Sequence, residues 1–398
     1  MERQEDMADK LWNSNYIKVM IANFLLFFAF YLLTPLLPLY LSETFHSSKD
    51  IIGIVLSGYT FTGLIFRPFS GFFVDSYPRK KVLMVCFFFF FIFFSSYLFA
   101  GTLLMFAIFR TLHGGPFGAL TVANSTVAID VLPSSRRNEG IGYYGLSNNL
   151  AMAIAPFVGI LVYKYVQNFN LLFGLAFVVA GIGMLVDSKV EIPVKALVRN
   201  KQKLSFDRFF LIKGWLLGFN VMFFGFCFGV LSNYLAIYGK EMLGITSGTA
   251  TYFLLLSVGL VLSRLQGSKS LREGHLTKNA KEGILISLVG YALFVCCSNM
   301  IGYYMSAFLI GLGNGHMFPA FQNMIIDVAN HNERGTANST LLISWDVGIG
   351  LGILIGGFLV DTFNYTTAFG FVLLFHALGV FLFFAFGSKF YLKRTRRI

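Results

Sequence analysis

Twelve apolar stretches constrain the fold of this chain more than any other feature of its sequence. About 20 predominantly apolar residues suffice for one helix to cross a lipid bilayer. Stretches of about this length or longer lie at residues 16–42, 51–73, 82–100, 102–131, 140–163, 168–187, 209–238, 247–266, 281–298, 301–330, 336–361 and 364–388. We therefore predict an all-α integral membrane protein with 12 transmembrane helices.

The composition supports lipid as the solvent for most of the chain. Hydrophobic residues make up 56% of the 398 residues and charged residues only 13%, whereas soluble proteins average near one quarter charged. One or two soluble cores are too small to hide so much apolar surface, which includes 48 Phe. The four Cys lack metal-ligand spacing, and no Gly-Lys-Ser/Thr nucleotide loop occurs, so we predict neither a metal nor another cofactor.

The basic residues indicate the orientation of the spans. An even number of spans places both termini on one side of the membrane, and the loops then alternate between the two sides. Of 31 Lys and Arg, only Lys49, Lys164 and Lys240 fall in loops on the opposite side. The positive-inside rule therefore predicts cytoplasmic termini in a plasma or inner membrane. The net charge of +12 then reflects topology and contact with anionic lipid rather than nucleic-acid binding.

An internal repeat divides the chain into two halves. A polar, basic linker at 188–208 separates six spans in residues 1–187 from six spans in residues 209–398. An offset of 197 residues aligns identical residues at Asn23 and Asn220, Arg67 and Arg264, Lys81 and Lys278, Gly114 and Gly311, Gly118 and Gly315, Asp130 and Asp327, Arg137 and Arg334, and Gly159 and Gly356. A constant offset indicates duplicated halves, so we predict two pseudo-symmetric six-helix bundles.

Small residues form a ridge with a spacing of four in both the fifth and the eleventh span. The ridge consists of Ala151, Ala155 and Gly159, together with Pro156, in the fifth span and of Gly348, Gly352 and Gly356 in the eleventh. Small residues let helix backbones approach closely in lipid. The presence of this ridge in both halves favours a paired, sliding interface between them, and a purely structural dimer seam is the alternative.

Three motifs resemble those of the major facilitator superfamily, and within it the twelve-span drug and metabolite efflux branch. Residues 71–81, Gly-Phe-Phe-Val-Asp-Ser-Tyr-Pro-Arg-Lys-Lys, resemble the loop signature G-x-x-x-D-x-x-G-R-R/K. Residues 110–114, Arg-Thr-Leu-His-Gly, are similar to R-x-x-q-G, and residues 151–160 to the exporter signature G-x-x-x-G-P-x-x-G-G, with Ala or Ile at three of its Gly positions. The resemblance covers essentially the whole chain.

This resemblance implies a cytoplasmic gate. It implies that Asp75 docks near the start of the eleventh span and that Arg79 reaches Asp130, so that the cytoplasmic side is locked while the cavity faces outward. The gate residues are then Gly71, Asp75, Arg79, Lys80, Asp130, Arg137 and Arg334. Plain control of topology by charge is the alternative for the basic residues.

Ionisable residues inside the spans are functional candidates, because a charge at the bilayer centre costs at least ~3 kcal/mol. At 1.5 Å per residue, Arg110 lies about 12 Å and Asp346 about 15 Å deep. Asp346 is the only carboxylate near mid-depth, so we predict that it carries the coupling proton. A permanent ion pair of Asp346 with Arg110 or with a His is the alternative.

Polar residues form stripes at helical spacing on four spans, and these stripes predict the lining of a substrate cavity. The candidates are Asn23, Tyr31, Arg110, His113, Asn124, Asn220, Tyr234, His316 and Asn323. Hydrogen-bonded packing inside the protein is the alternative for the two His.

Taken together, these features predict a secondary transporter that works by alternating access. Proton-coupled efflux of a small amphipathic drug or metabolite is our leading hypothesis, with a monomer as the working unit. Uptake or facilitated transport of a metabolite, or flipping of a lipid-like solute, is the alternative. An intramembrane enzyme is a distant alternative, since neither H-E-x-x-H nor G-x-S-x-G occurs.

Overall fold

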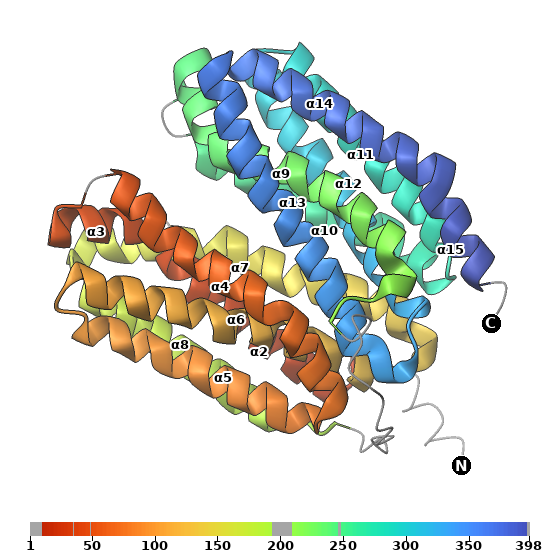
Figure 1. Cartoon of the computed structure of the whole chain (residues 1–398), viewed down its shortest axis with the longest axis horizontal. Coiled ribbons are helices and arrows are strands. Elements are labelled where there is room, and N and C mark those ends of the chain that lie inside the picture. Colours follow the sequence, from red (N-terminus) through yellow and green to blue (C-terminus); the bar gives the residue numbers. More distant parts are fainter. Residues whose placement is uncertain (1–9, 35, 48, 193–208, 246–247, 396–398) are drawn as a thin grey trace. The chain divides into compact units, whose positions relative to one another are not determined.

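The fold consists of long helices that match the predicted spans (Figure 1). The computed structural model describes residues 10–34, 36–47, 49–192, 209–245 and 248–395, and all regular secondary structure in these residues is helical. Helices of at least 18 residues are α2 (Ser14–Leu33), α4 (Lys49–Ser76), α5 (Arg79–Ser96), α6 (Leu103–Val131), α7 (Arg137–Val166), α8 (Phe169–Ser188), α9 (Trp215–Leu243), α10 (Gly248–Arg272), α11 (Leu276–Cys296), α12 (Met300–Asp327), α13 (Arg334–Thr362) and α14 (Tyr365–Leu382). The predicted all-α membrane fold is thereby confirmed.

Within the described residues, nine helices are long and apolar enough to cross a membrane by length and composition. The helices α4, α10 and α12 occupy the three remaining predicted spans. Short elements complete the chain: α3 (Leu37–Phe45), α15 (Ser388–Thr395), a π-helical turn at Phe383–Gly387 and 3₁₀ turns at Tyr97–Phe99, Ser134–Arg136, Ile212–Gly214 and His331–Glu333.

The first predicted span, at residues 16–42, is divided in the structure. Helix α2 ends at Leu33, and α3 begins at Leu37 with Pro38 in its first turn. Proline has no N–H to donate and its ring collides with the preceding helical turn, so the first turn is its most favourable position in a helix. Regular α-helix is therefore interrupted between Leu33 and Leu37, a break that an apolar stretch alone does not reveal.

Asparagine and threonine set the start of several helices. The side chain of Asn13 accepts from the N–H of Tyr16, that of Thr102 from Met105, that of Asn168 from Asn170 and Leu171, that of Asn299 from Gly302, and that of Asn364 from Thr367. The first N–H groups of a helix have no partner within the helix, and such caps satisfy them. Thr102 and Asn299 are 197 residues apart, so the internal repeat extends to the caps of α6 and α12.

The chain forms two compact units. The first unit comprises Met1–Gly140, Tyr144–Phe210 and Asn332–Ser339, and the second comprises Ile141–Tyr143, Leu211–His331 and Thr340–Ile398. The start of α13 thus packs with the first unit. The predicted halves, 1–187 and 209–398, stay a prediction, and residues 193–208 of the expected linker lie outside the described residues.

The two units use glycine in the same way to pack their central helices. A Cβ atom on Gly114 of α6 would collide with the carbonyl oxygen of Tyr59 on α4. In the second unit, a Cβ atom on Gly311 of α12 would collide with the carbonyl oxygen of Leu256 on α10. Gly114 and Gly311 are 197 residues apart in the sequence, and so are their partners Tyr59 and Leu256. The aligned glycines therefore have a physical cause, which is close backbone approach between these helix pairs.

The small-residue ridge packs inside its own unit. A Cβ atom on Gly348 or Gly352 of α13 would collide with the carbonyl oxygen of Met222 or Phe226 on α9. In the first unit, a Cβ atom on Gly159 of α7 would collide with the carbonyl oxygen of Leu32 on α2. These contacts explain the small residues by close helix packing within each unit, and the paired interface between the halves stays a prediction.

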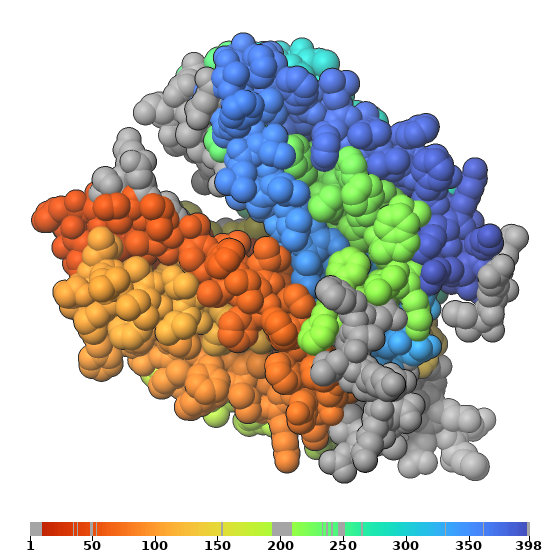
Figure 2. All heavy atoms as spheres, in the orientation of Figure 1, coloured from red at the N-terminus to blue at the C-terminus, as the bar shows by residue number. Residues whose placement is uncertain are grey.

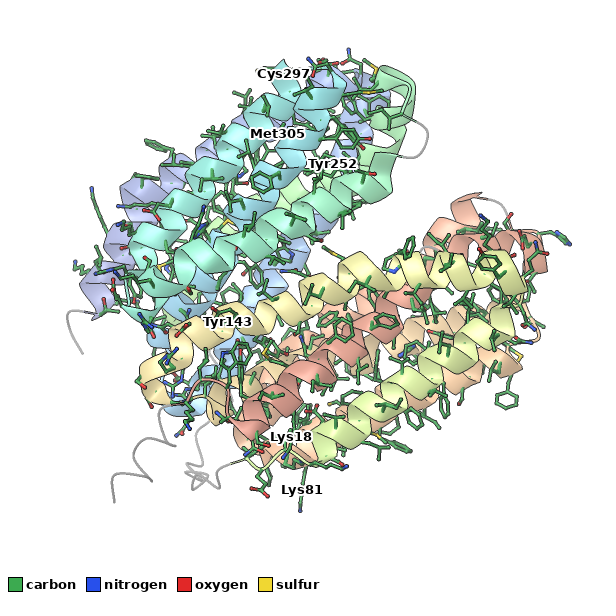
Figure 3. The ribbon with its side chains drawn as sticks, turned by 180° about the vertical axis from the view of Figure 1, so that it is seen from behind. Lys18, Lys81, Tyr143, Tyr252, Cys297 and Met305 are labelled. Carbon is green, nitrogen blue, oxygen red and sulfur yellow. The ribbon has the colours of Figure 1, made fainter. Side chains whose placement is uncertain are left out.

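Large apolar side chains cover the outside of the helices. Exposed examples come from both units and include Ile54, Phe61, Phe157, Leu354 and Phe358. Figure 2 shows one face of this surface, from the N-terminal helices in red and orange to α14 in blue. Exposed apolar side chains of this size and number fit a surface that faces lipid. Lys18 and Lys81, which lie together at one end of the first unit, mark its basic end (Figure 3).

Candidate functional site

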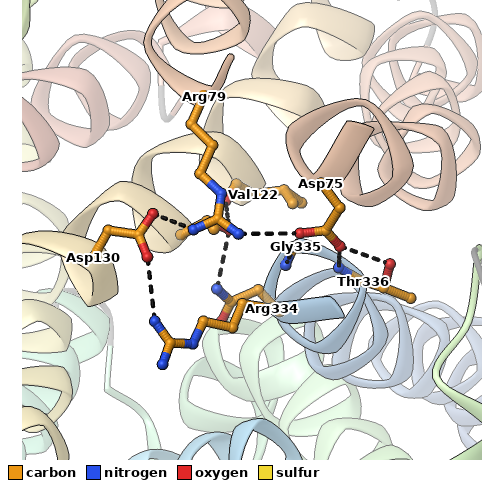
Figure 4. A network of polar contacts seen from close by, with 9 residues as sticks. Asp75, Arg79, Val122, Asp130, Arg334, Gly335 and Thr336 are labelled. Carbon is orange, nitrogen blue, oxygen red and sulfur yellow. Dashed lines mark hydrogen bonds and ion pairs between the residues drawn. The ribbon is translucent and has the colours of Figure 1, made fainter. Parts of the chain in front are cut away.

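The carboxylate of Asp75 caps the amino-terminal end of α13. Its oxygens accept the N–H of Gly335 (2.9 Å), the N–H of Thr336 (2.9 Å) and the hydroxyl of Thr336 (3.0 Å) (Figure 4). Asp75 lies in the last turn of α4, and its side chain is largely buried. The positive end of a helix dipole and two N–H groups without intrahelical acceptors stabilise a carboxylate at this position.

Arg79 joins Asp75 to a second carboxylate, Asp130, which Arg334 also binds. The guanidinium of Arg79 donates to Asp75 (3.4 Å) and also to Asp130, and Nη1 of Arg334 donates to Asp130 (3.3 Å). We call Asp75, Arg79, Asp130 and Arg334 the Asp–Arg network (Figure 4). Its two negative and two positive charges balance, so the network can be buried without a net charge.

Gly71 allows α4 to approach α13 closely at the network. A Cβ atom at Gly71 would lie 2.9 Å from Cβ of Ser339 and 3.0 Å from the carbonyl oxygen of Gly335. The hydroxyl of Ser339 donates to the carbonyl oxygen of Arg67 at 2.6 Å. The side-chain amide of Asn338 donates to Thr126 at 3.2 Å. The first six residues of α13 are thus held against α4 and α6 by both charged contacts and close packing.

Two other residues of the expected gate make different contacts. Nζ of Lys80 donates to the carbonyl oxygens of Asp187 (2.6 Å), Ser188 (3.0 Å) and Val190 (2.7 Å). Lys80 thereby caps the carboxyl-terminal end of α8, where a cation interacts favourably with the helix dipole. Arg137 is the first residue of α7, and its Nη2 donates to the hydroxyl of Ser134 (3.4 Å).

Asp187 is a site that the sequence analysis missed. Its side chain is fully buried, and neither carboxylate oxygen has a hydrogen-bond partner among the described residues. The ammonium of Lys80 interacts with it electrostatically. Its position at the end of an apolar stretch resembles an ordinary span boundary. A single acidic residue between that stretch and a basic segment is the only signal that distinguishes it.

Arg110 and His113 lie inside the first unit and share a tyrosine. Nη1 of Arg110 donates to the hydroxyl of Tyr97 (3.3 Å), which also forms a hydrogen bond with Nδ1 of His113 (2.7 Å). Both side chains are buried. The other ring nitrogen of His113 and Nε of Arg110 have no hydrogen-bond partner among the described residues. The two residues predicted to line the site therefore come together at Tyr97, in the 3₁₀ turn that follows α5.

Aromatic rings surround the guanidinium of Arg110. Its Cζ lies 3.9 Å from the ring centroid of Tyr59 and 5.9 Å from that of Phe30. Phe30 stacks on Tyr59 at 5.3 Å and on Phe117 at 4.7 Å. We call Arg110, Tyr59, Tyr97, Phe30 and Phe117 the Arg110 cluster. An arginine over the face of a tyrosine gains cation–π energy, which offsets part of the cost of its burial.

The polar side chains of α6 contact two different sets of helices. Asn124 donates to Oδ1 of Asn23 (3.3 Å), which also accepts from the hydroxyl of Tyr144 (2.7 Å). The side-chain amide of Asn23 donates to the hydroxyl of Ser147 at 2.7 Å. Asn23 and Asn124 thus join α2, α6 and α7, whereas Arg110 and His113 face α4 and α5. Tyr31 packs on Phe27 and Phe30 instead, with centroids 6.0 and 5.0 Å away.

In the second unit, the predicted polar residues are also packed between helices. The ring of His316 forms hydrogen bonds with Asn279 (3.0 Å) and Gln266 (3.4 Å), which is the hydrogen-bonded packing weighed as an alternative. The hydroxyl of Tyr234 donates to the carbonyl oxygen of Ile353 on α13 (2.9 Å). Asn323 is buried on α12.

Asn220 and Asp346 occupy different environments in the second unit. Asn220 is fully buried, and its amide has no hydrogen-bond partner among the described residues. Asp346 lies on α13 and is half-buried. The preceding residue, Trp345, has its carbonyl oxygen against Gly225 of α9, where a Cβ atom would lie 2.5 Å away. The backbone of α13 next to Asp346 therefore packs closely on α9.

The chain is similar to known transporters over nearly its full length. Residues 19–278 and 274–397 match the model of the Major Facilitator Superfamily. The Staphylopine export protein of Staphylococcus aureus is 22% identical over 350 residues, which cover 85% of this chain and 87% of that protein. The uncharacterized MFS-type transporter YhhS of Escherichia coli is 22% identical over 347 residues, with 85% and 84% covered.

Solved structures share this fold at low sequence identity. The human organic anion transporter MFSD10 (TETRAN) has a TM-score of 0.79 and 15% identity, with 93% of this chain and 99% of that chain covered. The transporter FucP, in the outward conformation, has a TM-score of 0.78 and 14% identity, with 94% and 98% covered. These likenesses concern the fold alone.

Proposed function

Because the chain belongs to the major facilitator superfamily, it is a multi-pass membrane transporter, and we propose that it exports a small amphipathic molecule in exchange for protons. Similarity to an export protein supports the direction. The family consists of transporters, so the distant alternative of an intramembrane enzyme is not retained. The proposal places both termini in the cytoplasm, where the basic loops would face anionic lipid, and takes the monomer as the working unit.

The docking of Asp75 on α13 is the observation that carries this proposal. Alternating access needs a contact that holds one side closed and can be broken in each cycle. Hydrogen bonds to charged groups contribute about 1.5–3 kcal/mol each, and Asp75 makes three at the start of α13. A contact of this strength is specific, yet it is weak enough to be exchanged for water when α13 moves away.

Asp346 is our candidate for the proton carrier. A carboxylate inside a membrane helix is costly when charged, so a change in its access to water shifts its protonation. Asp346 lies 12 positions after the first residue of α13, the same helix whose start is bound by Asp75. Movement of α13 would therefore change the surroundings of both carboxylates together. This link between the proton site and the docking contact is what an antiporter requires.

Reconstitution tests this function directly. Wild type, Asp346→Asn and the exposed control Glu282→Gln are placed in liposomes that contain a pH-sensitive dye, and dyes, antibiotics, sugars and lysolipids are added in turn. We expect solute-driven proton movement with wild type and Glu282→Gln, and its loss with Asp346→Asn while solute binding is retained. Equal signals from all three proteins would remove Asp346 from the mechanism.

The same experiment separates export from the alternatives. Solute loaded inside or outside the liposomes shows which gradient drives the proton signal. Solute flux without proton movement would indicate facilitated transport, and transfer of a labelled lysolipid between leaflets would indicate flipping. Co-movement of solute and protons in one direction would indicate proton-coupled uptake and would contradict antiport.

A further inference from the structure

The guanidinium of Arg110 is buried in the first unit, and no carboxylate of the described residues pairs with it. Its one hydrogen bond to the described residues runs from Nη1 to the hydroxyl of Tyr97 at 3.3 Å. The rings of Tyr59 and Phe30 cover its face, and its Nε is buried without a hydrogen-bond partner among the described residues. Arginine stays protonated in proteins, so a full positive charge lies here among aromatic and hydroxyl groups.

Two half-buried arginines of this unit do have carboxylate partners. Arg79 and Arg334, both in the Asp–Arg network, bind the carboxylates of Asp75 and Asp130. A charge within a membrane helix is as a rule paired or faces a site for an ion or substrate. Cation–π contact and one hydroxyl replace only part of the hydration of a guanidinium. Among the described residues, Arg110 therefore has no anion that balances its charge.

We propose that Arg110 binds the anionic group of the transported molecule, so that the substrate is an amphipathic organic anion that carries a carboxylate. The edge of the guanidinium formed by Nε and Nη2 makes no hydrogen bond to the described residues, and this edge matches the two oxygens of a carboxylate. This inference rests on the proposed transport function and names the substrate class for it.

The aromatic part of the Arg110 cluster fits the apolar part of such a molecule. Phe30, Tyr59 and Phe117 form a continuous set of rings with centroids 4.7–5.3 Å apart beside the guanidinium. Phe30 and Phe117 are only half-buried, whereas Arg110 behind them is almost completely covered. A ligand would reach Arg110 by displacing these two rings, and it would replace their contacts with its own apolar surface.

Equilibrium binding to matched probes tests the charge preference. The full chain is placed in phosphatidylcholine nanodiscs, so that no anionic lipid competes. 2-Naphthylacetate, 2-(2-naphthyl)ethanol and 2-(2-naphthyl)ethylammonium share one apolar body and differ in charge, and isothermal titration calorimetry gives their affinities. We expect the anion to bind at least tenfold more tightly than either of the others.

Variants assign the preference to the guanidinium. Arg110→Gln should abolish the preference for the anion, Arg110→Lys should retain part of it, and the exposed control Lys269→Gln should leave it unchanged. Phe117→Leu should weaken all three probes by a similar factor, because it removes aromatic contact without changing charge. Should Arg110→Gln fail to fold, the wild-type preference and its reduction in Arg110→Lys decide the question.

Three results with wild type would overturn the inference: equal affinities for the three probes, a preference for the ammonium probe, or no binding of any probe at millimolar concentration. An anion preference that survives in Arg110→Gln would overturn it as well. The test needs no gradient and no transport. Anion binding without proton-coupled flux in liposomes would therefore support the assignment of Arg110 while contradicting the proposed antiport. Flux of cationic solutes alone would contradict only the substrate class.

Discussion

Asp75 binds Thr336 twice, through its backbone N–H at 2.9 Å and its hydroxyl at 3.0 Å, although the two residues are 261 positions apart in the sequence. Thr336 lies in the first turn of α13, where N–H groups have no acceptor within the helix. Asp75 acts there as a cap supplied by another helix, and its charge also interacts with the helix dipole. The start of α13 consequently depends on a residue of α4 for its order.

Removal of this cap should expose the first amides of α13. In Asp75→Ala, the N–H groups of Gly335 and Thr336 lose their acceptor, at a cost of about 1–2 kcal/mol. We expect their hydrogen exchange to accelerate roughly 5–30-fold, measured by mass spectrometry of peptides that cover residues 332–340.

The internal controls for this experiment are helices with a local cap. The N–H of Gly302 is bound by Asn299, and that of Thr367 by Asn364. Their exchange should stay at the wild-type rate in Asp75→Ala. Unchanged exchange at Gly335 and Thr336, or equal acceleration at all four amides, would contradict a specific role of Asp75.

The close backbone contact between α9 and α13 leads to a second prediction, which concerns the stability of two glycine variants. A Cβ atom at Gly352 would collide with the carbonyl oxygen of Phe226, whereas a Cβ atom at Gly350 meets nothing within 4 Å. Gly352→Ala should therefore lower the free energy of unfolding by about 2 kcal/mol or more through overpacking. Gly350→Ala should leave it unchanged or raise it by about 0.5–1 kcal/mol, because alanine favours the helix.

Thermal and denaturant unfolding in detergent measure this difference. The two substitutions add the same methyl group to the same helix two positions apart, so their contrast isolates the collision with α9. Equal stability of both variants would show that the backbones separate without cost, and the seam near Asp346 would then be loose.

Much of the fold could be predicted from the sequence because its signals are local. The length of each apolar stretch defines a helix, and the offset of 197 residues aligns residues with the same packing task, such as Gly114 and Gly311. The motif around Asp75 led to its expected partner through the family resemblance rather than through spacing. Composition and hydropathy alone place Asp75 only in a basic loop.

The orientation of the buried polar residues could not be predicted in the same way. The second half of α6 is buried on all sides, so its hydropathy marks no single face toward a cavity. Asn124 therefore turns to α2 while Arg110 and His113 turn to α4 and α5. The environment of Asp187 depends on Lys80, which lies 107 positions away, and no pattern along the chain records that contact.

The capping of α8 by Lys80 makes a third prediction. Lys80→Met keeps the length of the side chain but removes the three hydrogen bonds to the end of α8 and the positive charge beside Asp187. We expect the free energy of unfolding to fall by about 2 kcal/mol. The neighbouring Lys81 is exposed, and Lys81→Met should change stability by less than about 0.5 kcal/mol.

A second substitution separates the two roles of Lys80. In Lys80→Met, Asp187 is left as a buried carboxylate without a cation, so Asp187→Asn should restore part of the lost stability. Additive losses in the double variant would mean that Lys80 acts only as a helix cap. Unfolding in detergent at one pH measures all four proteins.

The two asparagines related by the repeat should respond differently to the same substitution. Asn23 makes hydrogen bonds with Ser147, Tyr144 and Asn124, whereas the amide of Asn220 has no partner among the described residues. The positions 197 residues after these three partners are occupied by Ser344, Leu341 and Phe321. Two of the three therefore have no polar side chain that could bind Asn220. Both side chains are fully buried, so truncation to alanine removes the same atoms from comparable sites.

Asn23→Ala should therefore be the more destabilising by about 3 kcal/mol, since it breaks three hydrogen bonds and leaves the hydroxyl of Tyr144 without its acceptor. Asn220→Ala should cost little, because the loss of packing is offset by removal of a buried amide that has no partner. Comparison of the two free energies of unfolding in the same detergent measures the difference. A loss at Asn220 as large as that at Asn23 would instead show that Asn220 binds a group that stabilises the second unit.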